Sequence, residues 1–195
     1  MRTTTSILHI VDSLPEGQET RHLAEVVRGI AESAVACGMT SGSQPEDNCV
    51  SSITVLRIPH LRTHGSFISH IRAFIELSRV IKKFAPSLIH THGTIAGRLG
   101  RIVPGDYARV HTFDASASEL VSGRGLRHEL RVIIEKLLAN RSELLITEDP
   151  ELAERLRGVE IGLDQDWAVI PMTSVHEIIA AHSAAYESAL NTLHR

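Results

Sequence analysis

The segment His90-Thr91-His92-Gly93-Thr94 combines residue types with a spacing that could do chemistry. Side chains two apart on a strand point to the same side, so a strand that ends here places both histidines on one face. The glycine and threonine that follow then begin a helix, whose N-terminus could bind a phosphate or a carboxylate. Two histidines at this spacing could also be metal ligands.

A second segment, His111-Thr112-Phe113-Asp114, ends another predicted strand. His111 is the candidate for a third metal ligand, and Asp114 could orient a histidine or accept a hydrogen bond from a substrate hydroxyl. An aspartate at this point is also a common helix or turn cap. A metal site needs carboxylate support as well, and neither an HExxH motif nor an acidic cluster supplies it, so we predict no metal.

The third segment is the loop that contains Gly17, Gln18 and Thr20, after the first predicted strand. A glycine there lets backbone N–H groups approach an anion at a helix N-terminus, and Thr20 could cap that helix. One glycine is not the GxGxxG pattern of dinucleotide sites. The sequence also has neither a GxSxG nor a GxxxxGK[ST] motif, so we predict no cofactor.

These segments belong to a pattern of short apolar strands that alternate with amphipathic helices. The alternation favours an α/β fold with a three-layer, Rossmann-like, doubly wound and mostly parallel sheet, covered by helices on both faces. In such sheets ligands bind beyond the carboxyl ends of the strands, where the three segments lie. The predicted strands are residues 6–11, 53–58, 88–91, 109–113, 144–147 and 167–170, and the predicted helices are 20–37, 66–84, 94–102, 126–139, 149–157 and 174–193.

The composition narrows the class of protein. The chain has 195 residues, a net charge of −3 and 43% hydrophobic residues, which suit one domain with its own core. Scattered charges without a basic face argue against nucleic-acid binding. Cys37 and Cys49 are too few for a disulfide framework, so we predict reduced thiols in the cytoplasm. The apolar runs are too short for a signal peptide or a transmembrane segment, which leaves peripheral contact with a membrane open.

The C-terminal tail differs from the rest of the chain. Residues 1–174 are predicted to form the Rossmann-like domain, and residues 175–195 a C-terminal amphipathic helix packed on it. Ile178, His182 and Tyr186 belong to an apolar stripe on this helix. Such a stripe needs a groove, either on its own domain or on another chain. We favour the first, and a homodimer through the tail helix is the alternative.

The three segments, in this order, resemble the N-terminal domain of family 4 glycosyltransferases, which have the GT-B fold. The resemblance covers residues 5–174 and rests on ILHIVDSLPEG, APSLIHTHGTIAGRLGR, RVHTFDA, LLITEDPELAERL and WAVIPMTS. It implies two Rossmann-like domains that face each other across a cleft. The N-terminal domain would hold the acceptor and the C-terminal domain the nucleotide sugar. It further implies transfer with retention of configuration and without a metal.

The chain departs from the family's pattern at several positions. Gln18 stands where a second glycine is usual, and its side chain would weaken a phosphate contact. Asp114 stands where the family has a histidine that faces the transferred sugar, and an anionic side chain there would repel the diphosphate. Glu148 replaces a serine, and Met172-Thr173 replace Asn-Gly. The C-terminal domain with its paired glutamates is also not part of the sequence, so we expect no transfer by this chain alone.

The resemblance thus implies an acceptor-side glycosyltransferase domain, a retaining hexosyltransferase when a separate donor-binding subunit completes it. Its partners would be a sugar acceptor and, with the second subunit, a nucleotide sugar. Two alternatives stay open: a non-catalytic glycan- or protein-binding module, and a metal hydrolase built on His90, His92 and His111. The resemblance assigns a catalytic role to Asp114 and substrate binding to Gly17, Gln18, Thr20, His92, Gly93, Thr94 and His111.

Overall fold

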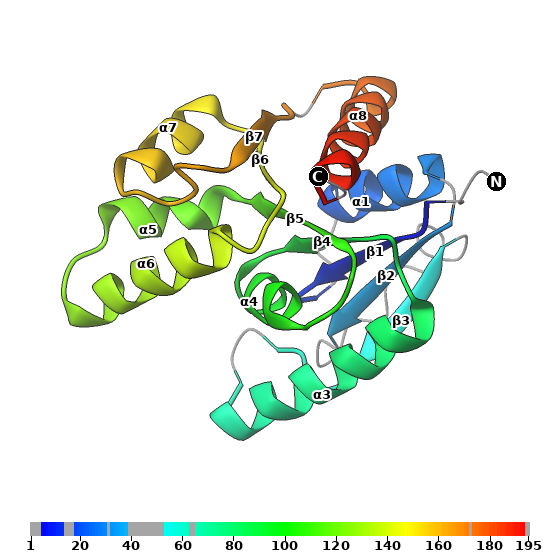
Figure 1. Cartoon of the computed structure of the whole chain (residues 1–195), viewed down its shortest axis with the longest axis horizontal. Coiled ribbons are helices and arrows are strands. Elements are labelled where there is room, and N and C mark those ends of the chain that lie inside the picture. Colours follow the sequence, from blue (N-terminus) through cyan, green and yellow to red (C-terminus); the bar gives the residue numbers. More distant parts are fainter. Residues whose placement is uncertain are drawn as a thin grey trace.

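The strands of the computed structural model form one sheet in the order β3-β2-β1-β4-β5-β6-β7 (Figure 1). Each pairing between neighbouring strands is parallel. The structure describes residues 5–13, 18–30, 32–38, 53–62, 65–171 and 173–193, and the side chains of residues 18–22 are outside this description. The strands are β1 (Ile7–Val11), β2 (Ser33–Gly38), β3 (Thr54–Ile58), β4 (Leu88–His92), β5 (Ala108–Phe113), β6 (Leu144–Thr147) and β7 (Asp166–Val169).

Helices cover both faces of this sheet, which confirms the predicted α/β, Rossmann-like fold class. The segments α1 and α8 lie on one face, and α3 and α4 lie on the other (Figure 1). The helices are α1 (Gln18–Gly29), α3 (Phe67–Phe84), α4 (Thr94–Ile102), η1 (Ala115–Ser118), α5 (Glu119–Ser122), α6 (Leu126–Ala139), α7 (Pro150–Gly158) and α8 (Val175–Leu193).

The strand order reverses between β1 and β4, at the centre of the sheet. From β1 the chain moves outward to β2 and β3, and it then returns to β4 and moves outward the other way. The register sets His9 of β1 beside His90 of β4, and His92 beside Thr112 of β5. The carboxyl ends at such a reversal diverge into a crevice, where parallel α/β sheets bind their ligands.

Residues 20–37 do not form one helix, contrary to our prediction. The helix α1 ends at Gly29, and Ser33–Gly38 form β2 between β1 and β3. Glu32, with φ of 56°, lies in the turn between the two elements. A strand that is buried on both faces has no apolar alternation, and its alanines fit the stripe of a helix equally well. The predicted loop over residues 39–52 lies outside the described residues.

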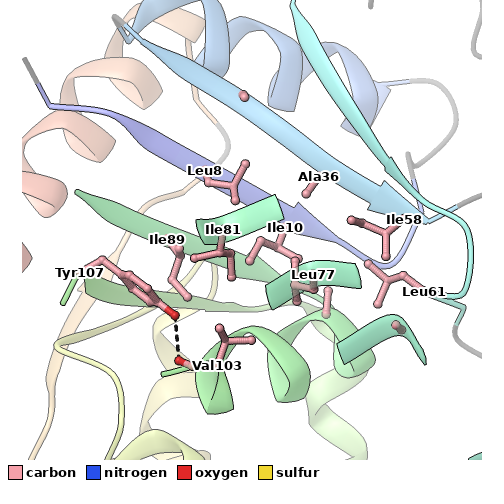
Figure 2. Packing of buried hydrophobic residues seen from close by; sticks show 13 residues of the cluster. Leu8, Ile10, Ala36, Ile58, Leu61, Leu77, Ile81, Ile89, Val103 and Tyr107 are labelled. Carbon is pink, nitrogen blue, oxygen red and sulfur yellow. Dashed lines mark hydrogen bonds between the residues drawn. The ribbon is translucent and has the colours of Figure 1, made fainter. Parts of the chain in front are cut away.

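The main core lies between the sheet and the helices α3 and α4 (Figure 2). Leu8 and Ile10 of β1 and Ile89 of β4 point to this face and pack with Leu77 and Ile81 of α3. All five side chains are buried, so the face is closed to water. Burial of this kind stabilises a fold by about 25 cal/mol per Å² of apolar surface.

The helix α8 buries its apolar stripe against the opposite face of the sheet. Ile178, Ala185, Tyr186 and Ala189 are the buried residues of the helix. Three of them pack into a core cluster with strand residues such as Val110. The helix lies against α1, β5 and β6. Among the described residues, no helix is both long and apolar enough to span a membrane.

Candidate functional site

A cleft of about 1030 Å³ lies at the carboxyl edge of the sheet, at the reversal of strand order. Its walls come from the ends of β1, β4, β5 and β6 and from the helices α1, α7 and α8. His9, His92 and His182 line one part of it, and Asp114 and Glu148 line another. The cleft therefore has a part lined by imidazoles and a part lined by carboxylates.

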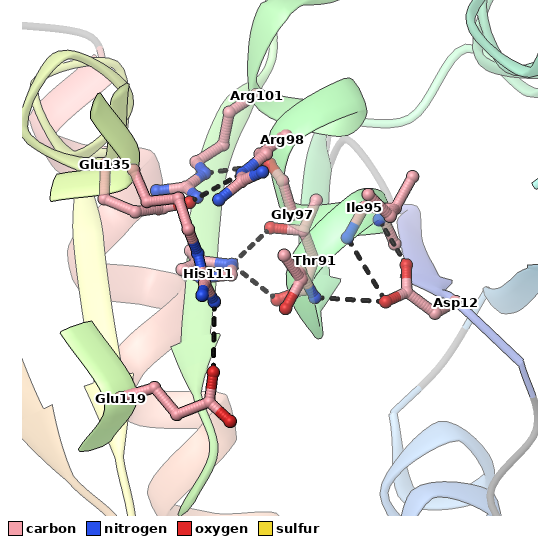
Figure 3. Close-up of polar contacts among 12 residues, drawn as sticks. Asp12, Thr91, Ile95, Gly97, Arg98, Arg101, His111, Glu119 and Glu135 are labelled. Atoms are coloured by element: carbon pink, nitrogen blue, oxygen red, sulfur yellow. Dashed lines mark hydrogen bonds and ion pairs between the residues drawn. The ribbon is translucent and has the colours of Figure 1, made fainter. Parts of the chain in front are cut away.

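Asp12 follows β1, and its carboxylate occupies the N-terminus of α4 (Figure 3). Its Oδ2 accepts hydrogen bonds from the N–H groups of Thr94 (3.1 Å) and Ile95 (3.2 Å), and Oδ1 accepts one from the N–H of Ala96. Gly93 has φ of 79°, and a Cβ there would lie 2.9 Å from Oδ2 of Asp12. The helix N-terminus predicted to bind an external anion therefore binds a carboxylate of the chain itself.

Burial raises the pKa of the Asp12 carboxyl. The backbone N–H groups of Ala96, Ile95 and Thr94 act in the opposite direction, and the negative charge of Asp114 adds to the rise. The N–H groups of the helix N-terminus replace part of the water that this partly buried carboxylate loses. Asp12 thus ties the end of β1 to the start of α4, and its role is structural.

Three histidines meet on the α1–α8 face of the sheet. His90 and His92 of β4 point to the same side, as alternation along a strand predicts, and their ring centroids are 4.0 Å apart. His9 of β1 lies beside them, with its Nδ1 3.4 Å from Nε2 of His92. The ring of His182, on α8, is 5.8 Å from that of His90. The four imidazoles form one cluster at the junction of the sheet with α8.

The two ring nitrogens of His90 have partners on different elements. Nδ1 shares a hydrogen bond of 2.7 Å with the hydroxyl of Tyr186, on α8. Nε2 shares one of 2.7 Å with Oγ1 of Thr112, on β5. The tail helix thus completes the hydrogen bonding of a histidine that lies at the centre of the sheet.

Burial keeps this histidine cluster neutral. It lowers the pKa of His9 and His90 well below the usual value, and it lowers the pKa of His92 to about 3. The neighbouring histidines lower these pKa values further, because a second positive charge nearby would be repelled. Neutral imidazoles can accept hydrogen bonds or bind a metal ion.

His111 lies on the other face of the sheet, away from His90 and His92. It pairs in register with Thr91, and residues that pair in register share a face. Its Nδ1 is 2.9 Å from Oγ1 of Thr91, and a Cβ on Gly97 would lie 2.6 Å from its Cε1. The structure thus brings His9, not His111, to the two histidines of β4.

A buried ion pair joins α4 to α6 on the face of the sheet that carries His111 (Figure 3). The Arg101 guanidinium, only 1% exposed, donates to Glu135 through Nη2 (2.6 Å), and Arg98 donates to the same carboxylate through Nε (3.1 Å). Burial lowers the pKa of Arg101, and the charge of Glu135 opposes that change. Sequence reasoning did not identify this pair, because its partners are 34 residues apart.

Asp114 is exposed at the end of β5, where its Oδ1 accepts a hydrogen bond from the N–H of Ser116 (2.9 Å). It caps the short helix η1, which is the common use of an aspartate at such a turn. Glu148 and Asp149 follow β6 in the same cleft. Among the described residues that line the cleft, Arg155 is the single arginine or lysine. Carboxylates therefore outnumber arginine and lysine side chains along the described walls of the cleft.

The predicted site residues, Asp114 as the catalytic one and the others as substrate-binding, fall into three groups. His92, Gly93 and Asp114 line the cleft, and the backbone N–H of Thr94 lies beside it, bonded to Asp12. His111 lies on the opposite face of the sheet. Gly17 is outside the described residues, and Gln18 and Thr20 belong to α1 with side chains that are not described. The assigned roles of these residues stay predictions.

Sequence reasoning missed Asp12, His9 and Tyr186. The sequence contained a sign of the first two, because His9 lies inside the first predicted strand and Asp12 directly follows it. The parallel register of β1 and β4 then places both beside the end of β4. Tyr186 lies 96 residues after His90, and no local pattern connects them.

Comparison with protein families gives a match over residues 17–173 to the family described as glycosyl transferase 4-like domain. This is most of the chain, and it includes α1, the histidine strand β4 and the segments that form the cleft. Comparison with curated protein sequences gives no match.

Comparison with solved structures finds the same fold in several enzymes. One chain of sucrose-phosphate synthase from Thermosynechococcus elongatus has a TM-score of 0.69 at 17% identity, over 93% of this chain and 98% of that chain. UDP-N-acetylglucosamine 2-epimerase from Rickettsia bellii has a TM-score of 0.56 at 12% identity, over 93% of this chain and 48% of that chain. The lipopolysaccharide outer core galactosyltransferase WaaB has a TM-score of 0.59 at 10% identity, over 86% and 45%. The chain thus spans about half the length of the longer enzymes that share its fold.

Proposed function

Because the chain belongs to the glycosyl transferase 4-like domain family, we propose that it is the acceptor-binding half of a sugar transferase. The observation that carries the proposal is the cleft at the carboxyl edge of the sheet, about 1030 Å³ in volume and lined by carboxylates. Ligand sites of small molecules occupy about 300–1,000 Å³, so the cleft has room for a sugar of more than one ring.

The polar groups of the cleft suit a neutral acceptor. Asp114, Glu148 and Asp149 can accept hydrogen bonds from sugar hydroxyls, and Thr112 and Ser116 can donate as well as accept. Hydrogen bonds to charged groups contribute about 1.5–3 kcal/mol each, which is more than neutral pairs contribute. The acceptor in this proposal is therefore a polyhydroxylated, uncharged glycan.

The same cleft is unsuited to the diphosphate of a nucleotide sugar. The α4 N-terminus already binds the carboxylate of Asp12, and Asp114 adds a further negative charge nearby. A diphosphate would need positive charge or free N–H groups. In this proposal the donor is therefore held by a separate subunit, and the chain does not transfer sugar alone.

The acceptor role is tested by calorimetric titration of the chain with a panel of neutral oligosaccharides. We expect one oligosaccharide class to bind and the Asp114→Asn variant to bind about 10- to 100-fold more weakly, which corresponds to one lost charged hydrogen bond. Asp106→Asn is the matched control, since Asp106 is exposed just before β5, at the opposite end of that strand. A panel in which nothing binds would refute the acceptor role.

The donor role is tested separately with nucleotide sugars. We expect the chain alone neither to bind UDP- or ADP-sugars tightly nor to release the nucleotide from them. Nucleotide release or glycoside formation by the pure chain, measured by a coupled nucleotide assay, would show that no second subunit is needed.

A binding module without turnover is the second candidate. Asp114, which stands where the resembled family has a histidine, favours it, because a carboxylate at that point opposes a departing diphosphate. The two candidates predict different results when the wild type and the Asp114→His variant are each mixed with a donor-binding subunit from a related transferase and glycoside product is measured. Product that appears only with the histidine favours the module, and product that appears already with the aspartate favours the transferase.

A further inference from the structure

The three histidines of the α1–α8 face have the spacing of a metal site. His9, His90 and His92 each offer one ring nitrogen, and the three nitrogens lie within 4.8 Å of one another. Nδ1 of His9 and Nε2 of His92 are 3.4 Å apart. Tetrahedral zinc with Zn–N bonds of about 2.0–2.1 Å places its ligand nitrogens about 3.3 Å apart. One edge of the tetrahedron is therefore already formed.

The proposed ligand nitrogen of His9 is Nδ1, and the other ring nitrogen is buried without a partner in the described part of the chain. His9 is 0% exposed, and its Nε2 makes no hydrogen bond there. Nδ1, and not Nε2, faces His92, so the ion would take the lone pair of Nδ1 and Nε2 would carry the ring proton. His9 and His92 also line the cleft, which gives an ion a path from solvent.

We propose that His9, His90 and His92 bind one divalent ion of the zinc class, with an open coordination position toward the cleft. Three histidines and an open position are the ligand set of a catalytic zinc site. Nε2 of His90 exchanges its bond to Thr112 for the ion, and Nδ1 keeps its bond to Tyr186, which orients the ring. The proposal rests on this geometry and is independent of the proposed acceptor role.

The test is a titration of chelator-treated protein with Co²⁺ and Zn²⁺. We expect one ion per chain, and with Co²⁺ the intense visible absorption of a tetrahedral site. His92→Gln is expected to abolish the signal, and Tyr186→Phe to weaken binding about 10- to 100-fold through loss of the orienting bond. His128→Gln, on α6, is the control for binding at other histidines and is expected to bind as the wild type does.

Several results would overturn the proposal. If the wild-type protein with Co²⁺ gives the weak absorption of an octahedral site, the proposal is wrong. Binding that His92→Gln leaves unchanged, or that His128→Gln removes, would overturn it as well. Circular dichroism of each variant separates a lost ligand from a lost fold. Sugar binding without metal binding would overturn this proposal while leaving the acceptor role intact.

A second, independent observation concerns α6, whose outer face is apolar. Leu126, Leu130, Ile133 and Leu137 are between 53% and 82% exposed. Their 4-3-4 spacing is that of the seam of a coiled coil. The inner face of the helix packs on its own domain through Leu138 and Ala139. A continuous apolar stripe on a surface marks an interaction site.

Charges beside the stripe favour a second copy of this chain as the partner. Glu129 and Lys136 stand seven residues apart on one side of the stripe, and Lys136 also pairs with Glu160 of its own chain (2.6 Å). When two such helices pack antiparallel, Glu129 faces Lys136 of the partner subunit twice, once at each end. A parallel pair would set Glu129 beside Ile134 of the partner subunit and gain no charge pair. We propose that α6 packs antiparallel on α6 of a second copy.

Light scattering after size-exclusion chromatography tests this dimer. We expect a dimer that dissociates on dilution, because the seam is short. Leu130→Glu is expected to give a monomer, and Leu163→Glu, at an exposed leucine elsewhere, is expected to leave the dimer intact. Glu129→Lys should weaken the dimer at low salt, and the added change Lys136→Glu should restore it. A wild-type monomer at high concentration, or a monomer that sediments with lipid vesicles through α6, would overturn the proposal.

Discussion

The two faces of the sheet beside β4 and β5 differ in the kind of polar side chain that they carry. On the α4–α6 face the charges are paired: the buried Arg101 with Glu135, and the partly buried Asp12 with the N-terminus of α4. On the α1–α8 face the polar groups are neutral imidazoles, and they border the cleft. Charges that hold helices to the sheet are unavailable to a ligand, whereas neutral nitrogens at an open edge remain available.

The largest expected effect is the loss of folding stability at acidic pH that the histidines of the α1–α8 face cause. The pKa values of His9, His90 and His92 are lowered in the folded protein, so below pH of about 6.5 the unfolded chain binds protons that the folded chain does not. Stability then falls by about 1.4 kcal/mol per pH unit for each such histidine, down to the folded pKa, which is about 3 for His92.

Urea unfolding of chelator-treated protein between pH 7 and 5 measures this slope. His182 and Tyr186 of α8 face the same cluster, so the slope includes His182, whose pKa burial also lowers. His92→Gln is expected to reduce the slope by about one proton. A stability that does not change over this range would show that the folded and unfolded chains bind protons equally, so that burial does not lower these pKa values, and the contrast between the faces would disappear.

On the charged face, Glu135→Ala is expected to destabilise the protein by about 3–5 kcal/mol, because it leaves the buried guanidinium of Arg101 without its carboxylate. Thermal unfolding measures the loss. The exposed pair of Arg131 and Glu119 provides the control, and Glu119→Ala is expected to change little. The double variant Arg101→Leu/Glu135→Leu should recover much of the loss. A small effect of Glu135→Ala alone would mean that water reaches this interface.

Gly97→Ala tests how closely α4 packs on the same face. A Cβ there would lie 2.6 Å from Cε1 of His111, so we expect a loss of about 1–3 kcal/mol from overpacking. Gly158→Ala, at the end of α7, meets no atom within 4 Å and is expected to be neutral or to stabilise by up to about 1 kcal/mol. Equal unfolding temperatures for the two variants would contradict the close packing.

Apart from the control variants, Asp12→Ala is expected to have the smallest effect on stability, and it is expected to change the binding at this edge. Loss of a helix cap costs about 0.5–2 kcal/mol. The N–H groups of Thr94, Ile95 and Ala96 then lose their carboxylate partner and can bind an external anion. We expect inorganic phosphate to bind the variant and not the wild type, measured by amide shifts in NMR spectra. Phosphate binding by both proteins would show that Asp12 does not block the site.

Much of the fold could be predicted from local patterns. Apolar runs identified β1, β4, β5 and β6, and the helix predicted from residue 66 is α3, which Ser66 caps by accepting the N–H of Ser69 at its Oγ. The error over residues 20–37 arose because small apolar residues fit a helix and a doubly buried strand alike. The site was predicted only in part: His92, Gly93 and Asp114 meet at the cleft, and His111 does not.

The sequence by itself determined the alternation of strands and helices and the side to which each strand residue points, because both follow from periods of 3.6 and 2 along the chain. The tertiary structure decided which residues meet across strands and helices. The order of the sheet brings His9 beside His90, and the path of α8 brings Tyr186 to the same ring. Asp12 reaches the N-terminus of α4 for the same reason. Such contacts depend on strand order and helix placement, and no local period encodes these.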